Sequence, residues 1–161
     1  MQKNKFNAAR LVKLAAVAAI YVALTYALGF MSYGNIQFRV AEMLMLLCFY
    51  KKDYGISLTV GCFIANLFSP MMLMDMVFGT LATVLAILLI FISPNIYVAS
   101  LAPVITNALI VGAELTICFN TPYWLNALEV AAGEFVCVTI VGVIVFKVLE
   151  KNGAFMKLIT E

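Results

Sequence analysis

Long apolar runs occupy almost the whole chain, and only short polar segments separate them. Of the 161 residues, 65% are hydrophobic and 11% are charged, whereas a soluble domain is about half apolar and about one-quarter charged. Because a helix needs about 20 apolar residues to cross a bilayer, the sequence predicts an all-α integral membrane protein. It predicts one transmembrane domain over residues 1–161 with six spans, at about residues 11–29, 37–50, 54–68, 73–92, 97–119 and 124–149.

The second and third predicted spans, 37–50 and 54–68, are short for a hydrocarbon layer of about 30 Å. Either the membrane is thinner around them or one segment is re-entrant, and the sequence leaves both alternatives open. The apolar stretch 14–31 follows several basic residues, as in a signal peptide, but it is longer than the usual roughly 7–15 apolar residues. We therefore interpret it as a retained first membrane helix.

The basic residues lie almost entirely at one end of the predicted bundle. Arg39 follows the first span and is opposite all the others. Those on the side of the termini are Lys3, Lys5, Arg10, Lys13, Lys51, Lys52, Lys147, Lys151 and Lys157. Because cytoplasmic loops are enriched in Lys and Arg, the sequence predicts that both termini are cytoplasmic.

Several function classes have no support in the sequence. The chain has no histidine, so a His-based metal or catalytic site is excluded. Its four cysteines lie in apolar runs without C-x-x-C spacing, which is typical of packing residues. No Walker A loop, G-x-S-x-G or H-E-x-x-H motif occurs, and a net charge of +2 is too small to indicate nucleic-acid binding. We expect neither an enzyme nor a cofactor.

Five carboxylates lie within the apolar runs or at their starts, where an ionised side chain is costly and usually faces a cavity, a partner or a substrate. They are Glu42, Asp75, Glu114, Glu129 and Glu134. The last three have no cation near them in sequence. In the predicted orientation all five fall in the outer half of the membrane, which predicts a polar cavity that opens to the outside.

Two of these carboxylates also have structural interpretations. Asp75 begins a span, where it would meet the positive end of the helix dipole. Glu42 follows Arg39 by one helical turn and would pair with it. Two amides join the candidate binding residues: Asn107 in the fifth span and Asn66 near the outer end of the third.

Aromatic residues flank the predicted outer mouth. Four of them lie near the outer ends of the spans: Trp124, Tyr123, Tyr33 and Phe38. They would either stack on a flat ring of a ligand or form the aromatic belt that membrane proteins place at the interface. The sequence alone leaves both interpretations open.

Alanines recur at four-residue spacing in the first span, at Ala15, Ala19, Ala23 and Ala27. This spacing places them in one stripe on a helix, and small side chains let another helix approach closely in lipid. The stripe therefore serves either packing within this chain or docking of a partner membrane protein.

Several segments resemble the QueT-type queuosine-precursor transporter family. Residues 36–44, IQFRVAEML, are similar to its IQFRVSEAL motif, and residues 61–70 are similar to its G-x-x-I-A-N-x-x-S-P stretch. Residues 75–83 are similar to its D-x-x-x-G-x-x-A-T stretch, and residues 107–109 and 133–134 also fit. The resemblance extends over nearly the whole chain.

The resemblance implies a substrate-binding (S) component of an energy-coupling-factor (ECF) transporter, a six-helix protein of a bacterial cell membrane. It implies a transmembrane coupling subunit, docked on the alanine stripe, and two ATP-binding subunits as partners. The implied substrate is a 7-deazaguanine such as 7-aminomethyl-7-deazaguanine (preQ1). From the carboxylates and the resemblance together, we expect the binding residues to be Arg39, Glu42, Asn66, Asp75, Asn107, Glu114, Trp124, Glu129 and Glu134.

Two alternative functions stay open at this point. The chain would equally suit an S component for another small molecule, such as a vitamin. It would also suit a membrane subunit without a transport role, in which the acidic residues pair with cations of a partner protein.

Overall fold

The computed structural model describes residues 8–32 and 37–160, and these residues form helices and connecting turns without a strand. In chain order the elements are α1 (Ala8–Ala27), α2 (Gly29–Ser32), η1 (Val40–Leu46), α3 (Leu47–Tyr50), α4 (Tyr54–Asn66), α5 (Met72–Ile92), α6 (Ile96–Phe119), α7 (Tyr123–Glu134), η2 (Phe135–Gly142), α8 (Val143–Leu149) and α9 (Gly153–Thr160). The first η element is a 3₁₀ helix and the second is a π-helix. The all-α prediction is confirmed for the described residues.

Within the described residues, four helical segments are long and apolar enough to cross a membrane: α1, α5, α6 and the continuous segment formed by α7, η2 and α8. Val40–Tyr50 and Tyr54–Asn66 are apolar but shorter. All six predicted spans therefore contain helices, and a full crossing by the two short segments stays a prediction.

The second helical segment begins at Val40, later than the predicted start at Gln37. Residues 37–39 are not helical, and the Phe38 N–H donates to the Met31 carbonyl at 3.0 Å. Gln37 lies very close to Gly133. A Cβ atom added at position 133 would collide with the Gln37 backbone. The approach of two segments far apart in sequence, and not the local apolar pattern, therefore sets this helix start.

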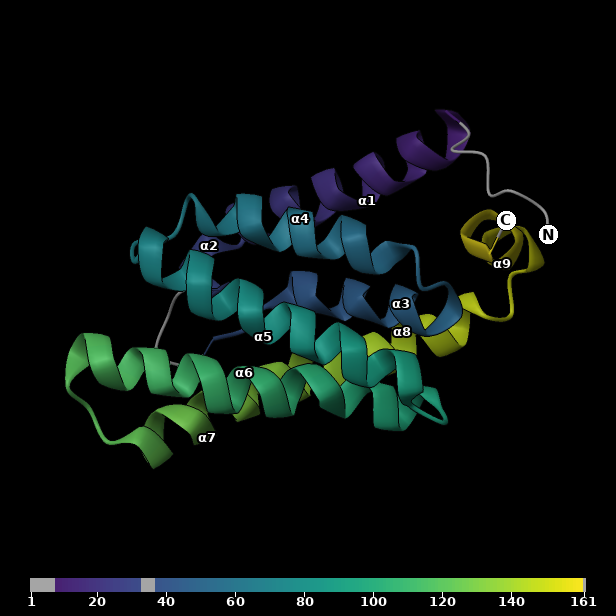
Figure 1. Ribbon diagram of the computed structural model, residues 1–161. Coiled ribbons are helices and arrows are strands. Elements are labelled where there is room, and N and C mark those ends of the chain that lie inside the picture. Colours follow the sequence, from purple (N-terminus) through teal and green to yellow (C-terminus); the bar gives the residue numbers. More distant parts are fainter. Residues whose placement is uncertain (1–7, 33–36, 161) are drawn as a thin grey trace.

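The long helices lie side by side with their axes along a common direction (Figure 1). α1 packs on α4, α4 on α5, α5 on α6 and α6 on α7, while η1 contacts both α1 and η2. The α4–α5 and α6–α7 connections lie at one end of the bundle, and the start of α1 and α9 lie at the other (Figure 1). We call these the connection end and the terminal end.

The helix surfaces place apolar side chains outward and polar side chains inward. On α5, Leu73, Val77 and Ile92 are exposed, whereas Asp75 and Thr83 of the same helix are buried. This arrangement reverses that of a soluble helix, and it suits a helix whose outer face contacts lipid. α5 therefore directs its polar residues into the bundle.

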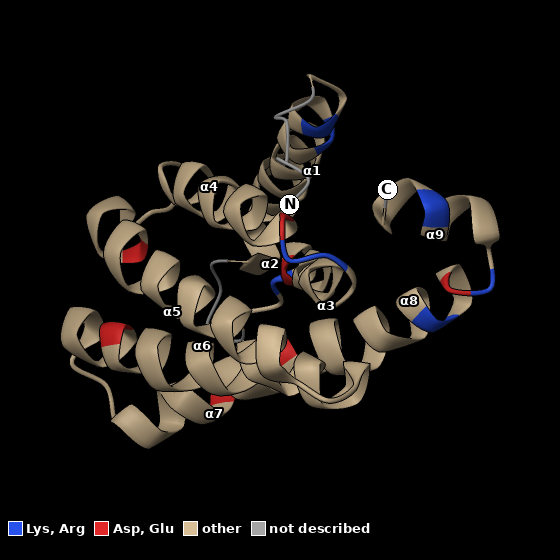
Figure 2. Ribbon diagram, turned by 45° about the vertical axis from the view of Figure 1, so that its right-hand side comes forward, with Lys and Arg blue, Asp and Glu red and all other residues tan. Residues whose placement is uncertain are grey.

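Most basic residues lie at the terminal end, whereas acidic residues also occur within α5, α6 and α7 (Figure 2). Lys13 Nζ donates to the Leu158 carbonyl at 2.9 Å, and Lys51 Nζ donates to the Thr160 carbonyl at 3.1 Å. The last carbonyls of a helix have no partner within that helix, and lysines often supply one. These contacts hold α9 against α1 and the α3–α4 connection.

Glu150 follows α8 and links it to α3 at the terminal end. Its Oε1 accepts a hydrogen bond from the Tyr50 hydroxyl at 2.7 Å, and its Oε2 accepts one from Lys147 Nζ at 2.9 Å. Both donors favour the charged carboxylate, and the Lys147 hydrogen bond contributes most to lowering the pKa of Glu150 below its usual value.

Candidate functional site

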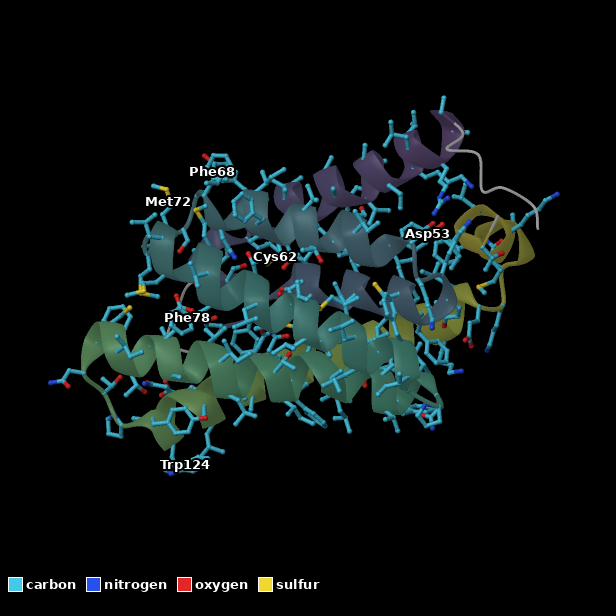
Figure 3. All side chains as sticks on the ribbon, viewed as in Figure 1. Asp53, Cys62, Phe68, Met72, Phe78 and Trp124 are labelled. Carbon is cyan, nitrogen blue, oxygen red and sulfur yellow. The ribbon has the colours of Figure 1, made fainter. Side chains whose placement is uncertain are left out.

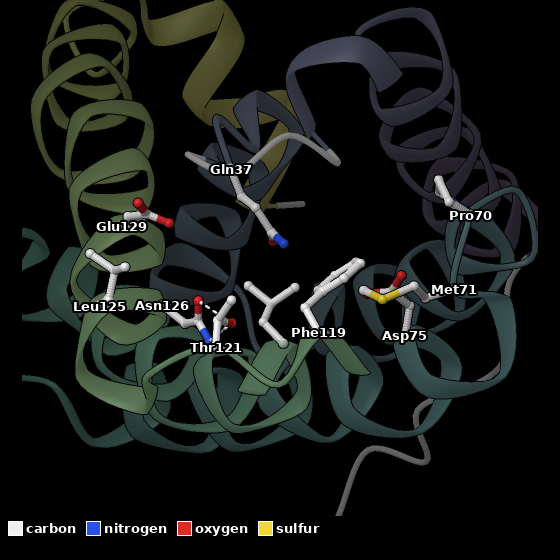
Figure 4. A pocket seen from close by; sticks show the side chains of 10 residues that line it. Gln37, Pro70, Met71, Asp75, Phe119, Thr121, Leu125, Asn126 and Glu129 are labelled. Carbon is white, nitrogen blue, oxygen red and sulfur yellow. Dashed lines mark hydrogen bonds between the residues drawn. The ribbon is translucent and has the colours of Figure 1, made fainter. Parts of the chain in front are cut away.

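A cavity of about 220 Å³ lies at the connection end of the bundle, between the start of α5, the end of α6, the start of α7 and residues 37–39. Figure 4 shows the side chains that line it. They are Gln37, Pro70, Met71, Asp75, Leu115, Phe119, Thr121, Leu125, Asn126 and Glu129. Two carboxylates and two amides thus face a cavity whose other walls are mostly apolar.

Arg39 joins two buried carboxylates beside this cavity. Its Nη2 lies 3.5 Å from Asp75 Oδ1, and its Nη1 lies 3.8 Å from Glu42 Oε1. All three side chains are buried. The predicted Arg39–Glu42 pair is present, and Asp75 shares the same guanidinium. Both distances exceed those of a charge-assisted hydrogen bond, about 2.7–2.9 Å, so neither carboxylate is tightly paired.

Two hydroxyl groups donate to the two carboxylates, and one amide donates to the backbone of Asp75. The Tyr21 hydroxyl on α1 donates to Glu42 Oε1 at 2.8 Å, and the Ser69 hydroxyl donates to Asp75 Oδ2. Asn66 Nδ2 donates to the Asp75 backbone carbonyl at 2.7 Å. These contacts tie α1, η1, the α4–α5 connection and α5 into one polar network.

The lack of a side chain at Gly79 leaves space for this polar network. A Cβ atom at Gly79 would lie 2.9 Å from Asn66 Nδ2 and 3.9 Å from Arg39 Nη1. The absence of a side chain on that face of α5 therefore lets the Asn66 amide and the Arg39 guanidinium approach the helix closely.

Glu134 and Asn107 form a second polar contact deeper in the bundle. Asn107 Nδ2 on α6 donates to Glu134 Oε1 on α7 at 2.9 Å, and both side chains are completely buried. The close crossing of Gln37 at Gly133 places residues 37–39 directly beside this contact. The contact therefore lies next to the same irregular segment that carries Arg39.

Glu114 is the least satisfied of the buried carboxylates. Its side chain on α6 is completely buried, and neither oxygen accepts a hydrogen bond from any described residue. It lies close enough to Asp75 for the two carboxyl groups to interact. Its neighbour in sequence, Leu115, lines the cavity, as does Asp75. Glu114 thus lies beside the cavity without a donor of its own.

Other buried acceptors on the cavity wall and in the two polar contacts also have no hydrogen-bond donor among the residues that the structure describes. They are Gln37 Oε1, Glu42 Oε2, Asp75 Oδ1, Asn107 Oδ1 and Glu134 Oε2, in addition to both oxygens of Glu114. Buried polar atoms in proteins are normally hydrogen-bonded. Such a concentration of free acceptors suits a ligand that brings several N–H donors.

The chain matches the family described as QueT transporter over residues 11–151. It belongs to the QueT transporter family. Over 75 residues it is 47% identical to the queuosine precursor transporter QueT of Lactococcus lactis subsp. cremoris (strain MG1363). That match covers 45% of this chain and 44% of the relative, so less than half of the relative's length is matched. No solved structure matches the chain. Family membership and the long apolar helices identify a multi-pass membrane protein.

The structure of this QueT-family chain brings most of the expected binding residues together. The residues of the two polar networks and their neighbour on α6 are Arg39, Glu42, Asn66, Asp75, Asn107, Glu114 and Glu134. Glu129 lines the cavity wall and is half-buried. Asp75 lies in the first turn of α5, as predicted for a helix-start carboxylate, and it also contacts Arg39 and the cavity.

Trp124 does not line the cavity. Its side chain is 71% exposed and points away from the bundle (Figure 3). It packs edge-on against Tyr123, with ring centroids 4.9 Å apart. This position favours the interfacial aromatic belt over stacking on a ligand. Phe38 packs against the buried core, and Tyr33 lies outside the described residues.

Several cavity residues were missed by sequence reasoning, among them Gln37, Phe119 and Thr121. Gln37 lies in the IQFRV segment that carries the family resemblance, two residues before Arg39, and that motif is the signal that could have identified it. Phe119 and Thr121 lie at the α6–α7 connection, where nothing in their local pattern distinguishes them from other loop residues. More residues from the connections between helices therefore line the cavity than the charged residues alone indicated.

The four alanines of the predicted stripe are all exposed on α1, whereas Tyr21 and Thr25 of the same helix are buried. Ala15, Ala19 and Ala23 line a shallow groove between α1 and α4. No described helix of this chain covers the stripe, so packing within the chain is not its role in this structure.

Proposed function

We propose that this protein is the S component of an ECF-type importer and binds a queuosine precursor, a 7-deazaguanine such as preQ1. The observation that carries the proposal is the cavity beside which buried carboxylates and amides present free acceptors. Its family membership and the name of the Lactococcus relative, a queuosine precursor transporter, support the same substrate class.

The hydrogen-bonding groups of a 7-deazaguanine complement these residues. Its ring N–H and exocyclic amino group are neighbouring donors, which suit one carboxylate through two parallel hydrogen bonds. An aminomethyl cation suits a second carboxylate, and the Asn107 or Asn66 amide or the Arg39 guanidinium suits the ring carbonyl. A volume of about 220 Å³ is below the roughly 300–1,000 Å³ of pockets for drug-sized ligands, which fits a ligand of this small size.

The orientation follows from the same proposal. Six spans with both termini in the cytoplasm of a bacterial cell place the connection end, and with it the cavity, at the outer face of the plasma membrane. A substrate would then enter from outside. The chain itself performs no reaction, and ATP hydrolysis belongs to the two ATP-binding partner subunits.

A ligand panel tests the substrate class. A ligand that binds only the folded protein raises its melting temperature, so the purified full-length protein in detergent should melt higher with preQ1 and unchanged with vitamins. Stabilisation by a vitamin alone would support an S component for another substrate. Stable association with a basic membrane protein, without stabilisation by any small molecule, would support the role of a non-transport subunit.

The exposed alanine stripe is proposed as the docking face for the transmembrane coupling subunit. Ala19→Leu places a bulky side chain in the middle of the stripe, and it should abolish co-purification with that subunit because close helix approach needs small residues. Ala16→Leu is the matched control, since Ala16 is exposed on α1 but lines a different groove. Equal co-purification of both variants would contradict the assignment.

A further inference from the structure

Four buried carboxylates lie near a single guanidinium, that of Arg39, which pairs with two of them. Glu42, Asp75, Glu114 and Glu134 are each at most 1% exposed, and Arg39 is 5% exposed. The other basic residues that the structure describes belong to α1, the α3–α4 connection, α8 and the C-terminal segment. Four ionised carboxylates beside one cation would carry a net charge of −3. Burial of that much unbalanced charge is strongly unfavourable, so the empty site must hold protons.

The contacts of each carboxylate indicate where an exchangeable proton resides. Glu42 accepts a hydrogen bond from Tyr21 and pairs with Arg39. Asp75 accepts a hydrogen bond from Ser69 and also pairs with Arg39. Glu134 accepts from Asn107 at 2.9 Å. Glu114 alone has no donor among the described residues, and it adjoins the carboxyl group of Asp75. Two neighbouring carboxyl groups in a buried site favour a state in which one is protonated.

The groups that face the Glu114–Asp75 pair come from several elements. Arg39 precedes η1, Cys118 lies on α6 near both carboxyl groups, and Glu129 on α7 lines the same cavity as Asp75. Arg39 is the only cation among them and is already shared with Glu42. Glu129 is half-buried on the cavity wall and lies less deep than the pair. Within this group Glu114 therefore has neither an ion-pair partner nor a hydrogen-bond donor of its own among the described residues.

We propose that the Glu114–Asp75 pair recognises a positive charge on the ligand, and that this cation replaces the proton that the pair holds in the empty site. The inference rests on the proposed function and adds a specificity rule to it. A protonated carboxyl group loses its proton to solvent, and the carboxylate that remains forms an ion pair with the ligand's ammonium group. One charge enters the site as another leaves it, so the net charge of the buried network is unchanged.

This exchange makes the site discriminate by charge and by pH. Binding of a cationic ligand releases a proton, so its affinity rises with pH, by up to about tenfold per pH unit for one proton. The affinity stops rising once the empty site has lost that proton. A neutral ligand of the same shape, such as 7-cyano-7-deazaguanine, releases no proton, and its affinity stays constant over the same range.

The test is calorimetric titration of the purified full-length protein with preQ1 at pH 7 in phosphate, HEPES and Tris, which differ in ionisation enthalpy. For the cationic ligand, the observed enthalpy should vary linearly with the buffer ionisation enthalpy, with a slope that corresponds to about one released proton. For the cyano ligand the slope should be zero. This pair of ligands tests the wild-type protein and does not depend on the folding of a variant.

The Glu114→Gln variant tests whether the released proton comes from the Glu114–Asp75 pair. Glu114→Gln should reduce the slope to near zero while preQ1 still binds, more weakly. Glu150→Gln, at the terminal end, should keep the wild-type slope. A zero slope for preQ1 binding to the wild-type protein, or an unchanged slope in Glu114→Gln, would overturn the inference and leave the proposed function intact. Absence of binding by both deazaguanines would overturn the proposed function as well.

Discussion

At the terminal end of the bundle, Arg10 and Asp53 meet at 2.6 Å with 26% and 28% of their side chains exposed, whereas at the connection end Arg39 meets Asp75 at 3.5 Å with both buried. Exposed ion pairs contribute little to stability, because water solvates their charges almost as well. Buried charges are costly to desolvate, so loose pairing there leaves interactions available to a ligand. The short, partly exposed pair therefore contributes little to stability, whereas the longer, buried contacts lie at the candidate site.

Removal of the central cation should have the largest effect. Arg39→Leu leaves four buried carboxylates without a guanidinium, and loss of one partner from a buried ion pair costs about 3–5 kcal/mol. Arg10→Leu removes a half-exposed pair at the terminal end and should cost about 0–1 kcal/mol. Denaturation of both variants in the same detergent measures the difference. Equal losses would break the distinction between the two ends.

Two glycines offer the next comparison. At Gly133 a Cβ atom would collide with the Gln37 backbone, whereas at Gly153 nothing lies within 4 Å of a Cβ atom. Gly133→Ala should therefore cost about 1–3 kcal/mol, the range for overpacking, and should weaken ligand binding because residues 37–39 shift. Gly153→Ala should leave both stability and binding near wild type. Thermal unfolding and calorimetry of the two variants check this, and tolerance of Gly133→Ala would contradict the close crossing.

Variants of one carboxylate at each end test whether the ligand binds at the connection end. Glu134→Gln should weaken preQ1 binding by at least about 1 kcal/mol, since it replaces a charged acceptor with a neutral one. Glu150→Gln, at the terminal end, should bind like the wild type. Calorimetry of both folded variants gives the comparison. Unchanged affinity in Glu134→Gln and in Glu114→Gln would remove these residues from the site.

The smallest effect concerns acid stability at the terminal end. Because the pKa of Glu150 is lowered in the folded protein, its contacts contribute stability above the ordinary pKa of 4.5 and lose that contribution as the pH falls through the folded value. Glu150→Gln should therefore melt slightly below the wild type at pH 7, and the gap should close as the pH falls below the lowered pKa of the folded protein. A gap that persists in acid would mean that the contact with Tyr50 acts without the charge.

The sequence predicted the helices and the gathering of carboxylates because both follow from local composition. Apolar runs determine where helices form in lipid, and a buried acid needs a polar surrounding wherever it lies. It did not predict the irregular residues 37–39, because that geometry depends on the crossing at Gly133, nearly a hundred residues away. The sequence-based assignment of Trp124 to the binding residues was wrong, because its side chain is exposed. The sequence around an aromatic residue near the end of a span does not tell whether its side chain faces the cavity or the lipid.

The most direct test of the account is an equilibrium titration of the purified full-length protein and its Glu114→Gln/Glu134→Gln double variant with preQ1. The account predicts saturable one-to-one binding by the wild type and an affinity at least about tenfold weaker in the folded double variant, because two charged acceptors are lost. Binding of equal affinity by both proteins, or no binding by the wild type, would contradict it.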